Sequence, residues 1–98
     1  MSSTLINDIS VTDIVYDYMF VEVINPALHQ KTLQYAITKK GNHNCIRKGN
    51  FKGQVVQLRL THIPDGIYEF SIQNEIGEQI IFPFEKKSEN YDQYLMKR

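Results

Sequence analysis

The sequence lacks two features that mark common classes of small domains: paired cysteines and an excess of charge. Its 98 residues include a single cysteine, Cys45, so no disulfide can form within the chain. Small secreted domains often depend on such cross-links. Lysine plus arginine and aspartate plus glutamate number 11 each, so the formal net charge is zero. Because nucleic-acid affinity comes largely from cations placed on phosphates, we expect no nucleic-acid partner.

Long apolar runs and tryptophan are also missing. No stretch approaches the ~18 apolar residues that a membrane helix needs, so we expect no membrane insertion. The first residues show no basic segment followed by an apolar run, as a signal peptide would. We therefore expect a virion or host-cytoplasmic location, with secretion or surface display as the alternative if the chain is a fragment. The absence of tryptophan disfavours a carbohydrate site built on exposed indole rings.

What the sequence does contain is alternation of apolar and polar residues with a period of two, which predicts strands. Seven short strands, separated by turns every 8 to 12 residues, predict an all-β sandwich or barrel. We expect the strands at 6–15, 18–24, 32–39, 45–48, 56–60, 68–73 and 80–84. We expect Gly49 and Asn50 to end the fourth strand and Gly53 to mark a further break.

The strand expected at 18–24 is apolar on both sides. One face carries Met19, Val21 and Val23, and the other carries Phe20, Glu22 and Ile24. The alternation therefore leaves open which face points into the core.

A hairpin near the end of the chain is the clearest element. Three large apolar residues on each arm share one face: Tyr68, Phe70, Ile72, Ile80, Phe82 and Phe84. Burying each of them contributes roughly 1.5–3 kcal/mol, so this hairpin should dominate the stability of the domain. Pro83 has no amide hydrogen for a ladder, which predicts a sheet edge or a bulge at that position.

The composition changes to charged and polar residues after the hairpin. We expect 1–87 to form the sandwich and 88–98 to form a C-terminal tail or short docking helix that Ser88 could cap. In such a helix one face would carry Tyr91, Tyr94 and Leu95.

One segment is more specific than the alternation. It reads Leu60-Thr61-His62-Ile63-Pro64-Asp65-Gly66-Ile67-Tyr68. It resembles the tyrosine corner of immunoglobulin-like and fibronectin type III domains, in which an early strand tyrosine bonds back to upstream backbone. The resemblance implies a seven-stranded antiparallel immunoglobulin-like sandwich in which Tyr68 is buried and its hydroxyl satisfies a backbone group.

The run 53–84 also resembles the C-terminal sandwich domains of secreted Bacteroidetes proteins. The residues that match the pattern of those domains are Leu60, Ile63, Pro64, Gly66, Tyr68, Asn74 and Gly77. This match covers about a third of the chain. It implies a fold and says little about function.

Residues that could carry chemistry are few and scattered. His29, His43 and His62 share no ligand spacing with each other or with Cys45, so we expect no metal site and no cofactor. The chain has no glycine-flanked serine elbow and no glycine-rich phosphate loop. We expect no catalytic residues, no enzyme activity and no small-molecule ligand.

These observations favour a structural accessory protein that binds other proteins. We expect a bacteriophage capsid decoration or other virion protein, held on a repeated capsid or tail lattice or by self-association. The alternative is an adhesion or binding module of a Bacteroidetes-type secreted or surface protein. The predicted interface residues are Tyr16, Tyr18, Pro83, Tyr91, Tyr94 and Leu95, because exposed tyrosine gives a large contact area at a small entropic cost.

Overall fold

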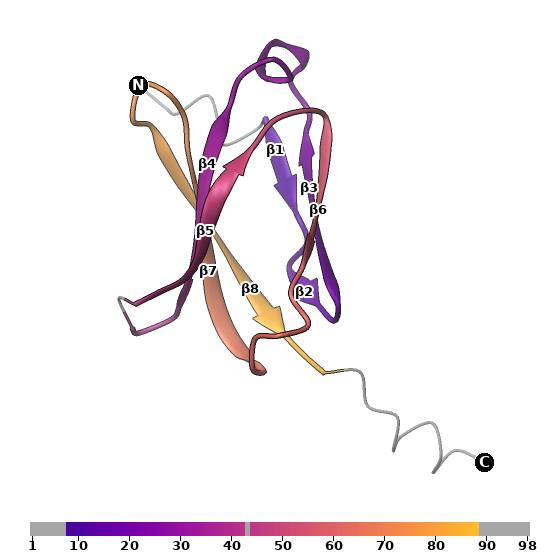
Figure 1. Cartoon of the computed structure of the whole chain (residues 1–98), viewed down its shortest axis with the longest axis vertical. Coiled ribbons are helices and arrows are strands. Elements are labelled where there is room, and N and C mark those ends of the chain that lie inside the picture. The colour runs from indigo at the N-terminus through magenta and orange to yellow at the C-terminus, as the bar shows by residue number, and fades with distance from the viewer. Residues whose placement is uncertain (1–7, 43, 89–98) are drawn as a thin grey trace, which may run out of the picture.

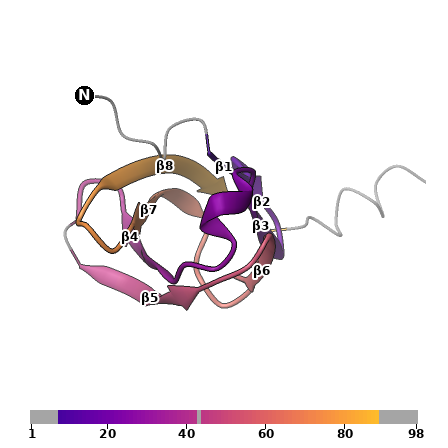
Figure 2. The ribbon, with the colours of Figure 1, turned by 90° about the horizontal axis from the view of Figure 1, so that it is seen from above.

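The protein is all-β in the computed structural model, which describes residues 8–42 and 44–88. One sheet has the order β1-β3-β6 and consists of β1 (Ile9–Val11), β3 (Tyr18–Val23) and β6 (Val55–Arg59). The other has the order β2-β8-β7-β4-β5 and consists of β2 (Ile14–Val15), β8 (Gln79–Lys86), β7 (Gly66–Gln73), β4 (Leu33–Lys39) and β5 (Cys45–Phe51). A 3-10 helix, η1 (Pro26–Leu28), links β3 to β4. The sheets form two layers, consistent with a β-sandwich (Figure 1, Figure 2).

The described residues hold eight strands, so the predicted count of seven is wrong. The single strand expected at 6–15 is divided between the sheets. β1 pairs antiparallel with β3, whereas β2 pairs parallel with β8, so the sandwich is not antiparallel throughout. The chain changes sheet between Thr12, whose N–H donates to the Phe20 carbonyl, and Asp13, whose carbonyl accepts from the Glu85 N–H.

The fourth predicted strand also differs, because β5 continues through Gly49 and Asn50 to Phe51. Gly49 lies opposite Tyr35 of β4. A Cβ at this glycine would lie 3.0 Å from the Tyr35 ring, so the glycine makes room for the ring and does not form a turn. The break predicted at Gly53 is confirmed, since this residue has φ 118° between β5 and β6.

The core lies between the sheets and settles which face of β3 points inward. Met19, Val21 and Val23 are buried, so Phe20 and Glu22 point outward. The β7–β8 hairpin is confirmed, with an antiparallel register from Gly66↔Lys86 to Gln73↔Gln79. Its largest buried side chains are held in ring pairs, with Tyr35–Phe70 and Tyr68–Phe84 centroids each 5.5 Å apart.

The turn before β7 has the backbone contact that the sequence predicts. Tyr68 is fully buried, and its hydroxyl donates to the Pro64 carbonyl at 2.6 Å. Asp65, in the same turn, accepts a 2.6 Å hydrogen bond from the Ser88 hydroxyl. The corner therefore ties the start of β7 to the chain that leaves β8.

Pro83 lies at a sheet edge, as predicted. The N–H groups of Glu85 and Lys87 donate to Asp13 and Val15 on the β2 side of β8. Residues two apart on a strand direct their backbone groups to the same side, so the Pro83 nitrogen also faces away from β7. β2 pairs only with Glu85 and Lys86, so within the described residues no strand lies beside Pro83 on that side.

The remaining expectations for the tail concern 89–98, which lie outside the described residues. The division into a sandwich at 1–87 and a tail at 88–98 therefore stays a prediction. In the part of the chain that the structure describes, no helix has the length and apolar character to span a bilayer.

Candidate protein-interaction surface

The outward side of the three-stranded sheet carries apolar side chains where a solvated sheet would be polar. Tyr18 and Phe20 of β3 lie opposite Arg59 and Gln57 of β6, and all four are exposed. Val55 is a diagonal neighbour of Phe20 on the same face, within reach of an aromatic side chain. We call Tyr18, Phe20, Ile24 and Val55, which are 41%, 49%, 53% and 58% exposed, the outer apolar face.

The backbone beneath this face is held on both sides of Phe20. On one side β3 pairs with β6. On the other, where β1 has ended, the Phe20 N–H donates to Thr12 Oγ1 at 3.0 Å and the Phe20 carbonyl accepts from the Thr12 N–H at 3.1 Å. Phe20 is therefore presented from a fixed backbone, which reduces the ordering cost of binding.

Tyr16 lies next to this surface in sequence, in the turn between β2 and β3. It is 48% exposed. The turn is tied to β6, because the Leu60 N–H donates to the Asp17 carbonyl at 2.8 Å. The chain is therefore fixed close to the point where Tyr18 begins β3.

The structure does not join the predicted interface residues into one patch. Tyr18 belongs to the three-stranded sheet, whereas Pro83 lies at the edge of the five-stranded sheet. Three further residues of the predicted interface, Tyr91, Tyr94 and Leu95, lie outside the described residues. A role for each of the six in binding stays a prediction.

Sequence reasoning missed three members of the outer apolar face: Phe20, Ile24 and Val55. A usable signal was Glu22, which shares a face with Phe20 and Ile24 in strand alternation. A glutamate is almost never fully buried without a partner, so its face is the outward one.

The histidines and the cysteine have structural or solvated surroundings where the structure describes them. His29 is half-buried, with Nε2 2.7 Å from the Val23 carbonyl. His62 is exposed, as is Cys45, whose Sγ donates to the Arg47 carbonyl. His43 lies outside the described residues. Among those described, no three His, Cys, Asp or Glu side chains are grouped so that they could hold a metal ion.

Two titratable groups in and beside the turn before β7 have shifted pKa values. Hydrogen bonds from the Ser88 hydroxyl and backbone lower the pKa of Asp65. Burial raises the pKa of Tyr68, and the nearby charge of Asp65 acts in the same direction. The Asp65 shift therefore arises from hydrogen bonds within the turn, and the Tyr68 shift arises mainly from burial in the core.

Comparison with known proteins adds no function to this description. A scan against models of protein families finds no match to the chain, and a search of curated proteins finds no relative. The function is therefore inferred from the chemistry of the two outer sheet faces.

Proposed function

We propose that this chain is an immunoglobulin-like interaction module, a non-enzymatic structural accessory of a larger protein assembly. The outer apolar face is the surface that docks on the partner. The observation that carries the proposal is that Tyr18, Phe20 and Val55 are exposed together on the outer side of one sheet, with the exposed Ile24 directly after β3. Single exposed apolar residues are ordinary, but several on one sheet face, here with Glu22 among them, favour an interaction site.

The strand order supports the immunoglobulin-like part of the proposal. In immunoglobulin sandwiches the A, B and E strands share one sheet, and the C, F and G strands share the other. Here β1, β3 and β6 form one sheet, while β4, β7 and β8 lie together in the second. The hydrogen bond from Tyr68 to the Pro64 carbonyl matches the tyrosine corner of that fold.

The residue types of the outer apolar face suit the centre of a protein interface. Tyrosine and phenylalanine are enriched there, since each buries a large area with few rotatable bonds. Arg59 lies beside Tyr18 on the same face, and arginine is also enriched at interface centres. A standard interface needs about 800 Å² on each partner, so neighbouring polar residues would form its rim.

A repeated lattice is the setting in which so small a contact surface is most effective. One domain offers a limited area, and its contacts become strong when many copies bind a regular array. A bacteriophage capsid decoration protein is the concrete form of this proposal.

The test compares two double variants in the native host. Phe20→Ser/Val55→Ser removes apolar surface from the outer apolar face, and Ile67→Ser/Ile81→Ser removes exposed isoleucines from the outer side of the other sheet. Size-exclusion chromatography of the lysate should show wild type and the second variant co-migrating with a large assembly. The first variant should migrate as a free domain with an unchanged melting temperature.

Two results would overturn the proposal. One is a wild-type chain that elutes as a free monomer from its native host. The other is co-migration of Phe20→Ser/Val55→Ser with the assembly to the same extent as wild type.

A further inference from the structure

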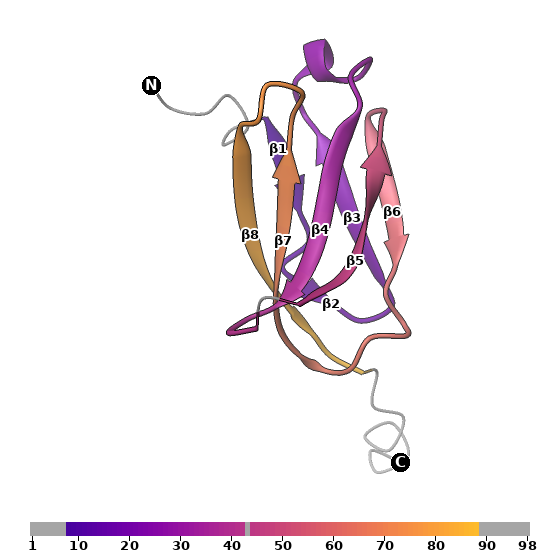
Figure 3. The same ribbon diagram turned by 60° about the vertical axis from the view of Figure 1, so that its left-hand side comes forward.

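A row of four amide side chains crosses the outer side of the five-stranded sheet. Gln34 of β4 lies opposite Asn50 of β5 on one side and Gln73 of β7 on the other, and Gln73 lies opposite Gln79 of β8. All four are exposed. Strands lie about 4.8 Å apart, so the row is about 14 Å long. We call these residues the amide row; the four strands that carry it lie side by side in Figure 3.

The surface along the amide row is hollowed. The next row of the sheet has small side chains at its centre, Ala36 and Ser71, which lie opposite each other. The Ser71 hydroxyl donates a hydrogen bond to the Ala36 carbonyl at 3.3 Å, so its side chain lies close to the backbone of the sheet. These two residues line a hollow of about 130 Å³, and a second hollow of about 300 Å³ lies on the other side of the row, toward Asn74 and Glu75 of the hairpin tip. Both hollows are lined by Gln34 and Gln73, and the smaller also by Gln79 and the larger by Asn50.

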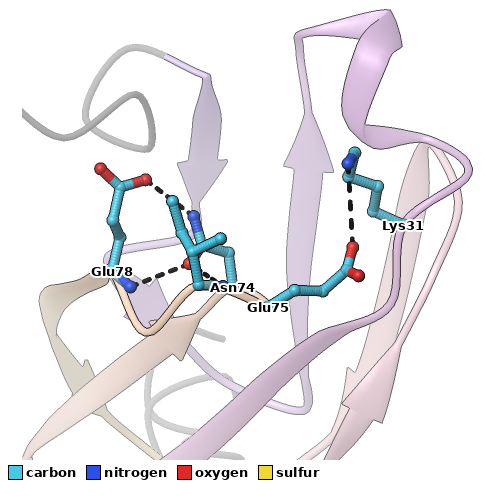
Figure 4. A network of polar contacts seen from close by, with 5 residues as sticks. Lys31, Asn74, Glu75 and Glu78 are labelled. Carbon is cyan, nitrogen blue, oxygen red and sulfur yellow. Dashed lines mark hydrogen bonds and ion pairs between the residues drawn. The ribbon is translucent and has the colours of Figure 1, made fainter.

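The hairpin tip at one end of the row is held in place by its own polar contacts (Figure 4). Asn74 Oδ1 accepts from the N–H groups of Ile76 and Glu78, and Asn74 Nδ2 donates to Glu78 Oε1 at 2.8 Å. Glu75 reaches back to Lys31, with Nζ and Oε1 3.8 Å apart. Gln73 and Gln79 flank this tip, so the backbone that carries them is fixed before any ligand arrives.

The Asn74 side chain uses its hydrogen-bonding groups within the hairpin tip, whereas the four amides of the row keep theirs for a ligand. Within residues 8–42 and 44–88, none of the four side chains makes a hydrogen bond to another described residue. Each amide offers two N–H donors and one carbonyl acceptor. The row therefore presents donors and acceptors together, at a regular spacing, above a hollowed floor.

We propose that the amide row binds a neutral oligosaccharide. Sugar hydroxyls are both donors and acceptors, so they match primary amides, which offer both groups. The charged residues that line the hollows are Lys48 and Glu75, one of each sign. Such a surface does not suit a phosphate or nucleic-acid chain, which needs several cations acting together.

An extended peptide suits this face less well than a sugar. Peptides bind sheets by adding a strand at an edge, with apolar pockets for alternate side chains. The amide row instead runs across four strands in the middle of a face. No aromatic side chain lines either hollow except Tyr35, which is buried. Binding therefore rests on hydrogen bonds and is weak, with a dissociation constant on the order of 1 mM.

The site is independent of the proposed protein interface, because the two lie on opposite sheets. A negative result for the saccharide site therefore does not bear on the proposed protein interface, and the reverse also holds. A saccharide ligand would make the chain an adhesion module in addition to any role in an assembly.

The experiment is a titration of the full chain, followed by ¹H–¹⁵N spectra of the side-chain amides. The probes are neutral tetrasaccharides of glucose, mannose and N-acetylglucosamine, with a permethylated tetrasaccharide as the control that lacks hydroxyl donors. At least one neutral sugar should shift the signals of Gln34 and Gln73 in a saturable way. The permethylated sugar should not.

The matched variants are Gln34→Ala/Gln73→Ala and Gln57→Ala, the last of which lies on the outer side of the other sheet. The double variant should bind roughly thirtyfold more weakly, since about 1 kcal/mol is lost with each of two hydrogen-bonding groups and about 1.4 kcal/mol is a factor of ten. Gln57→Ala should bind as wild type does. The proposal is overturned if no sugar gives saturable shifts or if the double variant binds as wild type does. It is also overturned if the amide signals shift with protein concentration and not with added sugar.

Discussion

The two sheets are alike on their inner faces and unlike on their outer faces. Inside, β3 contributes Met19, Val21 and Val23, while β7 contributes Tyr68, Phe70 and Ile72. Outside, the three-stranded sheet carries the aromatic side chains Tyr18 and Phe20, whereas the five-stranded sheet carries a row of amides beside exposed isoleucines such as Ile81. Packing requires the inner similarity, because both sheets close the same core. It does not require the outer difference, which is therefore the place to look for function.

The inner faces are also complementary in shape. The five-stranded sheet supplies rings that stack in pairs, such as Tyr35 with Phe70. The three-stranded sheet supplies smaller side chains such as Val21 and Val23. Large groups against small ones allow the dense packing that protein interiors show.

The largest expected effect compares how much a buried and an exposed phenylalanine contribute to the free energy of unfolding. Phe70→Ala should lower the free energy of unfolding by about 3–5 kcal/mol, because it leaves a cavity in the core. Phe20→Ala, at a half-exposed site, should change it by less than about 1 kcal/mol. Urea unfolding followed by circular dichroism measures both. Equal losses would mean that Phe20 is part of the core.

The sequence predicted the inner faces better than the outer ones, for a physical reason. Burial imposes an alternation of apolar and polar residues, so the β7–β8 hairpin could be identified from the apolar residues that alternate along its two arms. In β3 two of the three outward residues, Tyr18 and Phe20, are also large and aromatic, so alternation alone does not show which face points inward. An apolar outer face thus hides the alternation that would identify it.

Other features depend on contacts between distant segments, which alternation does not encode. The transfer of the chain from one sheet to the other at Thr12 and Asp13 is set by hydrogen bonds to Phe20 and Glu85. Glycine is a residue type typical of turns, but Gly49 lies within a strand, where its missing side chain makes room for the Tyr35 ring opposite. The amide row needs the register of four strands before its members come together.

The second prediction concerns the open side where β5 of one sheet approaches β6 of the other. Arg47 joins them: its Nε donates to the Tyr35 hydroxyl at 3.0 Å, and its Nη1 donates to the Arg59 carbonyl at 2.7 Å. Arg47→Met keeps an unbranched stem but loses both hydrogen bonds, so stability should fall by about 1–3 kcal/mol.

The control for the Arg47 variant is a substitution of the neighbouring residue, Lys48. Lys48 is exposed on the outer side of the same strand, so Lys48→Met should change stability by less than about 0.5 kcal/mol. Chemical unfolding of the two variants side by side makes the comparison. Similar losses in both would show that Arg47 does not link the sheets.

The third prediction compares two tyrosines, one on each sheet. Tyr68→Phe removes the hydrogen bond to the Pro64 carbonyl and should cost about 1 kcal/mol. The expected cost is that of one ordinary hydrogen bond, because the contact is only partly buried and Pro64 lies in an exposed turn. Tyr18→Phe, on the outer apolar face, should leave stability unchanged. Thermal unfolding of both proteins measures the difference. A loss of stability confined to Tyr18→Phe would show that the hydrogen bond from Tyr68 to the Pro64 carbonyl does not stabilise the fold.

The smallest effect appears only at high pH and separates the same two tyrosines. Burial raises the pKa of Tyr68 above its ordinary value of 10.0, so the folded state keeps the phenolic proton after the unfolded state begins to lose it. The folded state then binds more protons than the unfolded state, and stability must fall as pH rises above about 10. Below that pH the contribution is complete. Urea midpoints measured between neutral pH and the alkaline limit should decline in wild type and in Tyr18→Phe, but less steeply in Tyr68→Phe. Parallel declines in all three proteins would place the titrating group elsewhere in the chain.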